Sequence, residues 1–558
     1  MYNKTNCVIK RKYGGRKMTK LHKMLCIALL ACTASVNAFG VTNYKVETST
    51  YTFTVNEEPI VNFPALCING EYYMPISYLA EFIGFHVESD PQKPDVVMFV
   101  QGNSENAEEK IKKLNDFVKE PNRKVEVSKD QIGYGEQVFN PHLLKVDGEN
   151  FISVKEAAEF VGLYCYPDEN EKVIDFSTDK AKGLSKEVKE AYNKYFGEHA
   201  LDIDTKALSD KKLLKDSGLE KYPIILIGEN HGIAKTFEIE LFWIKYLNQN
   251  ANVRDILLEE GYCDAQLVNR YLETGDMTII EKMMDNLKGT FAHSKEQYEF
   301  YKALYEYNKT LPQDKKLKVY GVDIQHQVTT GLSYMSSLLP DQEEPKEIKE
   351  MIGLFREYVN GKLKSAENIT AVRKDFEAIQ KDMEVQKADY EAYLGTNLED
   401  FKASLNAIMQ KVTCEEGIAN REQKMMENFE MQYNKIGERK CLGIFGGDHT
   451  YMNADEECYN MATYLNNQGA KTKGKIGSIT LEYYNCSYMV PSRETTGETT
   501  RSLEYGTIEK MLAGATASDF ALFPLESENS IFVEDGSTRS QQYLMLIKES
   551  PAATPYAK

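Results

Sequence analysis

Short apolar runs and amphipathic stretches alternate along the chain from Tyr222 onward. The first run, in "YPIILIG", is followed by "KTFEIELFWIKYL", where apolar residues recur at helical spacing. Alternating buried strands and helices are typical of a largely parallel sheet flanked by helices. We therefore predict an α/β fold here, with strands in the runs PIILIG, DILLE, LKVYGVDI, CLGIFGG, GSITLEYY, FALFPL and YLMLIKE.

A charged block at about residues 343–437 interrupts this alternation. Leu, Ile, Phe and Met recur in the block at helical spacing, which indicates packed helices and not disorder. We predict a helical insertion, either a subdomain or a lid, within an α/β domain that covers residues 221–550. The preceding segment, residues 179–220, is charged and helical in pattern and is predicted to be a linker.

Two N-terminal segments, residues 66–100 and 144–178, resemble each other. Each contains a strand, a turn, a second strand, a short helix, a glycine and an alternating strand. The turns are Asn-Gly at residues 69–70 and Asp-Gly at residues 147–148, and both dipeptides are strong hairpin signals. A glycine after each helix fits a left-handed helix end. The repeat predicts a small α+β module that is used twice.

The first 38 residues have the pattern of an export signal. The basic stretch "KMTKLHK" precedes the apolar run "MLCIALLACTASV", and "VNA" ending at Ala38 is a small-x-small cleavage site. Alternatively, Cys32 in "LLAC" is a lipoprotein acylation site. Both interpretations place the mature protein outside the cytoplasm, secreted or at the cell surface. The apolar run is too short for a transmembrane span, so none is expected in the mature chain.

Composition narrows the class of protein further. A chain of 558 residues is too long for one core, so two or three domains are expected. The net charge of −18 argues against nucleic acid as a partner, because such a surface repels phosphate. Of ten cysteines, seven follow Ala38, so at least one is unpaired, and none forms a CxxC pair. Zinc ribbons and thioredoxin chemistry are therefore unsupported.

Polar residues collect where four of the predicted strands end. "IILIG" is followed by Glu229 and His231, "DILLE" ends in Glu259, "KVYG" leads into Asp323, and "CLGIFGG" leads into His449. In parallel α/β sheets, sites form beyond the carboxyl ends of the strands. Histidine can titrate near neutral pH and transfer protons. These endings predict a polar catalytic cleft at one rim of the sheet.

Each of these residues also has a structural interpretation. His231 could cap the helix that follows it, and His449 could be a core histidine with satisfied hydrogen bonds. Glu259 or the adjacent Glu260 could pair with a lysine or arginine as part of the scaffold. Asp323 could cap a loop.

Two further histidines, His293 and His326, are interpreted as surface or supporting residues, and Trp243 as a core residue. No GxSxG, HExxH, Walker A or strand-borne GxGxxG pattern occurs. Without a nucleophile, the mechanism expected is direct attack by water. His231 would remove the proton, and a neighbouring glutamate would orient the imidazole and hold its charge.

At these residues the chain resembles the erythromycin esterase family, from about Tyr222 to about Tyr488. This family lies within a superfamily that also holds haem-binding uptake proteins and the Tiki proteases. The stretches that carry the resemblance are "LIGENHG", "ILLEEGYCDAQLVNRYLETGD", "KEQYEFYKALYEYNK", "KVYGVDIQH", "NREQKMMENFE" and "GIFGGDHTYM". They follow the order of the family's motifs.

The resemblance implies an α/β fold and a water-mediated hydrolase that cleaves an ester or lactone. His231 would be the general base, assisted by Glu229, Glu259 and His449, with Asp323 at a further motif position. The motif arginine corresponds to Arg421, which would position the substrate or stabilise the developing oxyanion. The implied partner is a small-molecule ester or lactone, and no cofactor is required.

Two departures from the family keep alternatives open. Only Asn230 separates Glu229 from His231, where the esterases have two residues, and Gly446 and Gly447 stand where they have His-Asn. The shorter spacing is closer to the haem-uptake branch. Two His and two Glu could also ligate a divalent ion. The alternatives are a metal-dependent hydrolase or peptidase, and a non-catalytic surface protein that binds haem or another ligand.

The N-terminal repeat resembles the copper amine oxidase N-terminal-like domain, a stalk on many secreted bacterial proteins. The stretch "INGEYYMPISYLAEFIGF" carries this resemblance. It implies a spacer or wall-facing stalk over residues 44–178, with a possible cell-surface association. Its histidines, His86 and His142, have no ligand cluster around them in the sequence, so copper is not implied.

Overall fold

The computed structural model describes most of residues 46–557 and divides the chain into two compact units, Met1–Leu184 and Ser185–Lys558. Within that range it leaves undescribed residues 56–57, 69, 83–84, 91–92, 102–124, 135–136, 140, 147, 161–162, 169, 178, 364–368, 453–459, 492–499, 528–529 and 535–540. The predicted export signal, with Cys32 and Ala38, lies outside the described residues.

The first unit is built on an eight-stranded sheet in the order β11-β12-β1-β2-β3-β10-β9-β6. A second sheet has the order β4-β5-β7-β8. The strands and helices are β1 (Val46–Val55), β2 (Glu58–Ile68), β3 (Glu71–Pro75), α3 (Ile76–Phe82), β4 (Phe85–Asp90), β5 (Lys93–Gln101), β6 (Val125–Val127), β7 (Gln131–Tyr134), β8 (Gln137–Phe139), β9 (Leu144–Val146), β10 (Glu149–Ser153), α5 (Val154–Phe160), β11 (Tyr164–Asp168) and β12 (Val173–Ser177).

The structure confirms the predicted repeat. The hairpins β2–β3 and β9–β10 are each followed by a short helix and a further strand. Gly70 and Gly148 have φ of 87° and 98°, which suits glycine at these turns. The equivalent strands β3 and β10 pair antiparallel, with Met74 opposite Ile152. The two repeats are therefore joined edge to edge within one sheet.

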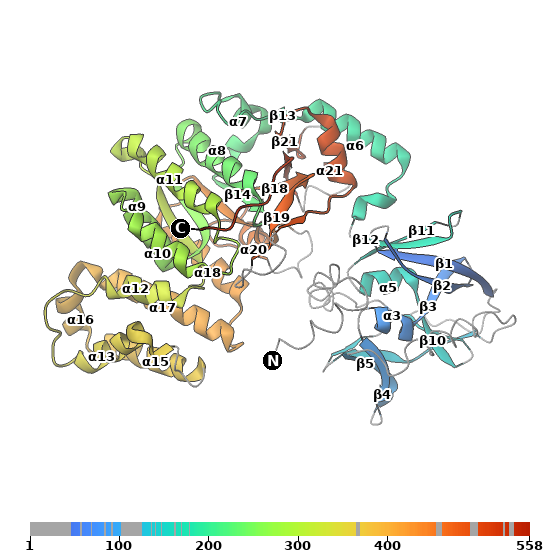
Figure 1. Ribbon diagram of the computed structural model, residues 1–558, viewed down its shortest axis with the longest axis horizontal. Helices are drawn as coiled ribbons and strands as arrows, with labels where there is room; N and C mark the ends of the chain where they lie inside the picture. The colour runs from blue at the N-terminus through green and yellow to red at the C-terminus, as the bar shows by residue number, and fades with distance from the viewer. Residues whose placement is uncertain are drawn as a thin grey trace. The chain divides into compact units, whose positions relative to one another are not determined.

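The second unit contains an eight-stranded sheet in the order β13-β21-β22-β18-β14-β17-β15-β16. All strand pairs from β22 to β16 are parallel, and β21 is antiparallel to both neighbours. The predicted α/β fold with a largely parallel sheet is confirmed (Figure 1). The strands are β13 (Leu201–Asp202), β14 (Ile224–Glu229), β15 (Asp255–Gly261), β16 (Lys318–Asp323), β17 (Cys441–Gly446), β18 (Ile476–Tyr484), β21 (Phe520–Pro524) and β22 (Tyr543–Lys548).

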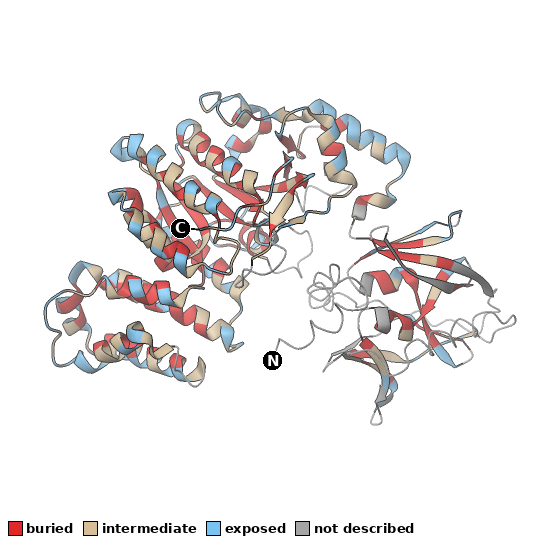
Figure 2. Cartoon of the chain, in the orientation of Figure 1, coloured by how far each residue is buried: buried red, intermediate tan, exposed pale blue. Residues whose placement is uncertain are grey.

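Helices cover both faces of this sheet. Successive residues of a strand point to opposite sides, and in β14 the residues on both sides are apolar and buried. On one face Ile225 and Ile227 of β14 pack in the cluster that contains Trp243, which is fully buried as predicted. Helices α8 (Ala234–Ala251), α9 (Tyr262–Thr274) and α11 (Lys295–Thr310) contribute to that cluster. On the other face Ile224 and Leu226 pack with α18 (Arg421–Lys435) and α20 (Met461–Asn467). Buried residues fill the layers between helices and sheet (Figure 2).

The predicted helical insertion has its own core. It comprises α13 (Lys349–Glu357), α15 (Ile369–Val385), α16 (Lys387–Leu394) and α17 (Leu398–Glu415), together with α12 (Val328–Ser336), which precedes the predicted start at about residue 343. Their apolar residues form one cluster together with Tyr262 and Cys263 of α9, so the insertion is docked on the main body. The predicted end at residue 437 was too late, because α18 packs on the sheet and not within the insertion.

The segment predicted to be a linker belongs largely to the second unit. Tyr195 and Phe196 of α6 (Lys186–His199) pack with Leu512 and Phe523. Leu201 of β13 pairs with Leu522 at the edge of the sheet. The boundary between the units therefore lies near residue 184 and not near residue 220.

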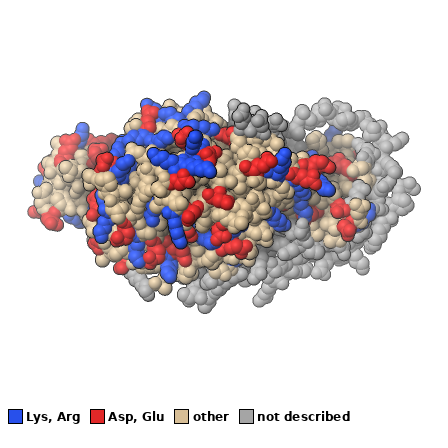
Figure 3. Space-filling view, turned by 90° about the horizontal axis from the view of Figure 1, so that it is seen from above, with Lys and Arg blue, Asp and Glu red and all other residues tan. Residues whose placement is uncertain are grey.

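Among the described residues, no helix is long and apolar enough to span a membrane. Among the described cysteines, five are free thiols: Cys67, Cys263, Cys414, Cys441 and Cys486. On the face drawn in Figure 3, acidic and basic side chains are interspersed. That face does not present the extended basic surface that tracks a phosphate backbone.

Candidate active site

Four neighbouring parallel strands, β14, β17, β15 and β16, bring the predicted site residues to one edge of the sheet. Glu229 ends β14 and stands beside Gly446, which ends β17. Glu259 lies near the end of β15, and Asp323 ends β16. Strand β17 comes late in the chain yet lies between β14 and β15, so His449 is brought close to Glu259.

His231 lies on the turn between β14 and α8, and its side chain is 43% exposed. The Nδ1 atom of His231 hydrogen-bonds Oε1 of Glu229. The other ring nitrogen, Nε2, has no hydrogen-bond partner among the described residues. A side-chain carbon on Gly446 would lie 3.3 Å from that Nε2 and 3.2 Å from Oε2 of Glu259. A side chain at Gly446 would therefore crowd both His231 and Glu259.

His231 does not cap the helix that follows it. The first amide groups of α8 are bound from elsewhere: the N–H of Ala234 donates to the carbonyl of Pro551 at 3.0 Å, and the N–H of Lys235 donates to Oγ of Ser550 at 2.9 Å. The N-terminal N–H groups of a helix need such acceptors because they have no partner within the helix. The structural interpretation of His231 as a cap is therefore excluded.

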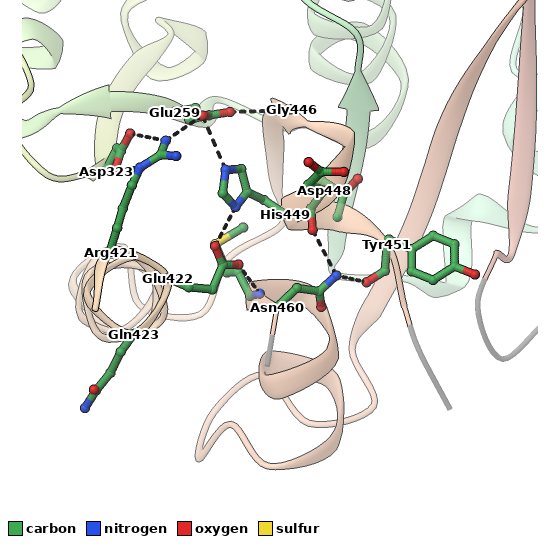
Figure 4. A network of polar contacts seen from close by, with 12 residues as sticks. Glu259, Asp323, Arg421, Glu422, Gln423, Gly446, Asp448, His449, Tyr451 and Asn460 are labelled. Atoms are coloured by element: carbon green, nitrogen blue, oxygen red, sulfur yellow. Dashed lines mark hydrogen bonds and ion pairs between the residues drawn. The ribbon is translucent and has the colours of Figure 1, made fainter. Parts of the chain in front are cut away.

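Arg421, at the start of α18, binds two carboxylates (Figure 4). Its Nε donates to Oδ1 of Asp323 at 2.9 Å, and its Nη2 donates to Oδ2 of Asp323 at 2.6 Å and to Oε1 of Glu259 at 2.7 Å. The side chain of Asp323 is 1% exposed, so the carboxylate of this bidentate ion pair is buried. The Nη1 atom of Arg421 has no hydrogen-bond partner among the described residues.

Glu259 and His449 form the centre of the same network. Oε2 of Glu259 accepts the backbone N–H of Gly446 at 2.6 Å, and Oε1 lies 3.4 Å from Nε2 of His449. Nδ1 of His449 lies 2.7 Å from Oε2 of Glu422. Both ring nitrogens of His449 are thus engaged, and the side chain is only 12% exposed. His449 holds Glu259 in place, which is closer to the structural interpretation of this histidine than to that of a proton-transfer group.

The electrostatics of the two histidines are dominated by their carboxylates. Burial acts to lower the pKa of His231, but the charge and hydrogen bond of Glu229, with the charge of Glu259, raise it to about 9. Burial also opposes the protonated form of His449, but Glu259 and Glu422 raise its pKa to about 10. Both imidazoles are therefore protonated in the resting protein at neutral pH.

The carboxylates of the network shift in the opposite direction. Burial acts to raise the pKa of Glu259, but His449, His231 and the Gly446 amide hold it well below its usual range. Burial likewise opposes the ionised form of Asp323, while hydrogen bonds from His326 and Arg421 lower its pKa. The two carboxylates are ionised and neutralised by neighbouring cations.

Three further contacts complete the site, and only that of Glu422 was not anticipated from the sequence. Glu422, which anchors His449, also accepts the N–H of Met461 at 2.5 Å. His326, interpreted as a surface or supporting residue, lies with Nε2 2.8 Å from Oδ2 of Asp323. Glu260 turns away from the site and accepts the hydroxyl of Tyr301 at 2.5 Å. The only sequence signal for Glu422 was its position next to the motif arginine.

The geometry of the site does not support binding of a divalent ion by its two histidines and two glutamates. Among the described side chains, no three His, Cys, Asp or Glu groups are placed to hold a metal ion. In the site itself, His449 uses both ring nitrogens on carboxylates, and Arg421 occupies the side of Glu259 that faces Asp323. Two of the four candidate ligands, Glu259 and His449, are therefore already engaged with other side chains.

Comparison with known proteins supports the resemblance seen in the sequence. The erythromycin esterase family model matches residues 249–475, which include Glu259, Asp323, Arg421 and His449. The match begins after Glu229 and His231. No curated protein matches the chain. The resemblance of the N-terminal repeat to the copper amine oxidase N-terminal-like domain is not tested by these comparisons and stays a prediction.

Solved structures with a similar course of the chain share little sequence with it. A Bacillus cereus protein is 16% identical, with coverage of 66% of this chain and 99% of that one and a TM-score of 0.48. A succinoglycan biosynthesis protein is 15% identical, with coverage of 67% and 100% and a TM-score of 0.49. An erythromycin esterase variant in its open conformation is 12% identical, with coverage of 62% and 95% and a TM-score of 0.43.

Proposed function

We propose that the second unit, which carries the match to the erythromycin esterase family, hydrolyses an ester or lactone by attack of water activated by His231. The observation that carries this proposal is the state of the His231 ring. Glu229 fixes Nδ1, while Nε2 has no partner among the described residues and lies next to Gly446. A histidine oriented by a carboxylate through one nitrogen can take a proton with the other.

The reaction requires three tasks from these residues. Neutral His231 accepts a proton from water at Nε2 while the water oxygen forms a bond to the carbonyl carbon. Glu229 stabilises the imidazolium that results. The free Nη1 of Arg421 donates to the oxyanion of the tetrahedral intermediate, because Asp323 and Glu259 hold the guanidinium in place. The imidazolium then gives its proton to the departing alkoxide, and an acid and an alcohol are released.

The test is a hydrolysis assay on the protein without its first 38 residues. The protein is treated with chelator and incubated with a macrolactone antibiotic and a panel of simpler esters. Mass spectrometry follows the gain of one water by each compound. We expect at least one substrate to gain water with the wild type and with His142→Ala, a histidine of the first unit, but not with His231→Ala. Equal turnover by the His231→Ala variant would refute the proposal.

Export and attachment are a separate proposal that rests on the N-terminal sequence. We propose that residues 1–38 direct export and that the first unit is a stalk at the cell surface. The mass of the mature N-terminus distinguishes the two routes: cleavage after Ala38 gives an unmodified amino terminus, and acylation gives a lipid on Cys32. Full-length protein retained in the cytoplasm with residues 1–38 intact would exclude both.

A further inference from the structure

The segment Ser550–Tyr556, which follows β22, runs between the His231 turn and the start of α11. Its sequence is SPAATPY, which contains no charged residue. It forms antiparallel bridges on both sides, from Ala552 to Ile233 and from Pro555 to Ser294. We name this segment the clip.

On one side, the clip fixes the backbone next to His231. The carbonyl of Gly232 accepts two N–H groups, one from Ala553 and one from Met489, both at 2.8 Å. Gly232 has φ of 85°, and any side chain there would meet Phe291 and the backbone of Met489. The clip also supplies the acceptors for the first N–H groups of α8. It therefore binds the turn at both Gly232 and Ala234. Ile233, the residue before α8, offers no side-chain cap of its own.

On its other side, the clip fixes the loop that carries Phe291. The N–H of Lys295 donates to the carbonyl of Thr554 at 2.8 Å, and the N–H of Tyr556 donates to the carbonyl of His293 at 3.0 Å. The Tyr556 ring packs against Tyr298 with a centroid distance of 5.1 Å. The Phe291 ring in turn lies 5.7 Å from the His231 ring, centre to centre.

We propose that the clip is a positioning element for His231, which it holds between Glu229 and Phe291 by bonding to the backbone on both sides. This inference rests on the proposed role of His231 as general base. Every one of the bridging contacts to the His231 turn is made by main-chain groups or by Ser550. Removal of the clip therefore leaves the catalytic side chains unchanged while it releases the turn that carries one of them. Misplacement of a catalytic group by about 1 Å can cost about 100-fold in rate.

Two matched proline variants test the proposal in the full chain. Ala553→Pro removes the N–H that binds Gly232. Thr554→Pro removes an N–H that binds Oε2 of Glu296 and does not contact the His231 turn. We expect kcat to fall about 10- to 100-fold for Ala553→Pro and less than about twofold for Thr554→Pro, with smaller changes in KM.

The second readout is the pKa of His231, measured by NMR titration of the imidazole resonances. It does not depend on activity, so it separates failure of the clip from failure of the proposed hydrolysis. Ala553→Pro is expected to shift this pKa towards 6.5, because the contact with Glu229 loosens, and Thr554→Pro is expected to leave it near 9. An unchanged pKa in Ala553→Pro, or equal shifts in both variants, would overturn the inference.

A truncation provides an independent check that does not depend on how proline is accommodated. A chain that stops after Glu549 lacks the clip, and a chain that stops after Tyr556 retains it. Addition of the synthetic peptide SPAATPYAK to the shorter chain should restore the His231 pKa with a saturable dose dependence. A shorter chain with an unshifted His231 pKa contradicts the proposal, as does a folded shorter chain that the peptide does not restore.

Discussion

The two halves of the strand-end rim differ in how far their polar groups are committed. Around Arg421, nearly every donor and acceptor is bound: Asp323 is bidentate, Glu259 has three partners, and both nitrogens of His449 are engaged. Around His231, one nitrogen is bound, the other has no partner among the described residues, and the side chain is 43% exposed. The groups around Arg421 have their hydrogen-bonding capacity filled and therefore act as a rigid support. Proton transfer needs a group such as His231, which keeps one nitrogen without a partner.

The largest effect is expected when the loosely bound half is removed. His231→Ala should lower kcat/KM about 10²- to 10⁴-fold, the range usual for loss of a general base. Above about pH 9, where the stability gained from protonation of His231 is lost, the same variant should change the free energy of unfolding of the second unit by less than about 1 kcal/mol. Steady-state kinetics and urea denaturation measure the two quantities. A large loss of stability with little loss of rate would reverse the comparison.

Removal of a charge from the saturated half should have a large effect on stability. Asp323→Asn leaves Arg421 partly buried without its bidentate partner, which should cost about 3 kcal/mol in the free energy of unfolding. Asp519→Asn is the control, since the exposed Asp519 carboxylate pairs with Lys235 at the surface and should cost less than about 1 kcal/mol. Urea denaturation followed by tyrosine fluorescence compares the two variants. Equal losses would show that the network is not a rigid support.

The pH dependence of the reaction should report the pKa of His231. The neutral imidazole is the active base, so kcat/KM should rise about tenfold per pH unit below pH 9 and level off above it. Glu229→Gln removes the charge that raises this pKa, so the midpoint should move towards the ordinary value of 6.5. A midpoint unchanged by Glu229→Gln would mean that another group limits the rate.

The same shift has a consequence for stability. The pKa of His231 is raised on folding from 6.5 to about 9, so its protonation stabilises the folded state. That contribution is complete below pH 6.5 and is lost as the pH rises through about 9. Stability and rate should therefore move in opposite directions across this interval, which thermal unfolding at several pH values can follow.

The smallest effect is expected from two adjacent glycines. Gly446→Ala places a methyl group 3.2 Å from Oε2 of Glu259 and 3.3 Å from Nε2 of His231, whereas Gly447→Ala places one at an ordinary 3.7 Å from its nearest neighbour. Gly446 has φ of −57°, so alanine is tolerated by the backbone. We expect kcat to fall about tenfold for Gly446→Ala, because the base is displaced, and to change little for Gly447→Ala. Similar rates for the two variants would show that this space is not used.

The strand ends were predictable from the sequence, whereas their order in the sheet was not. An apolar run that stops at a carboxylate or histidine indicates a strand end, and Glu229, Glu259 and Asp323 were located in this way. Strand β17 inserts between β14 and β15, although it starts about 217 residues after β14 and about 186 residues after β15. No local pattern encodes pairings between segments so far apart. The contact of His449 with Glu259 depends on that order.

The clip and the misassigned linker show a second limit. The clip acts through backbone groups, which leave no trace in the pattern of side chains, and its prolines and small residues are typical of a loop. In the charged helix α6, two apolar residues, Tyr195 and Phe196, are enough to attach it to the second unit. A pattern with so few apolar positions favoured a linker.

The edge-to-edge pairing of β3 with β10 makes the first unit an internal dimer. Tyr73 faces Ser153, Met74 faces Ile152 and Pro75 faces Phe151, so the equivalent residues Met74 and Ile152 lie at a pseudo-twofold centre. A chain with one repeat would leave the edge of β3 open, and two such chains could pair in this register. Covalent linkage replaces that association by an intramolecular one, whose effective concentration is of the order of millimolar. Assembly of the two linked repeats is therefore independent of the protein concentration.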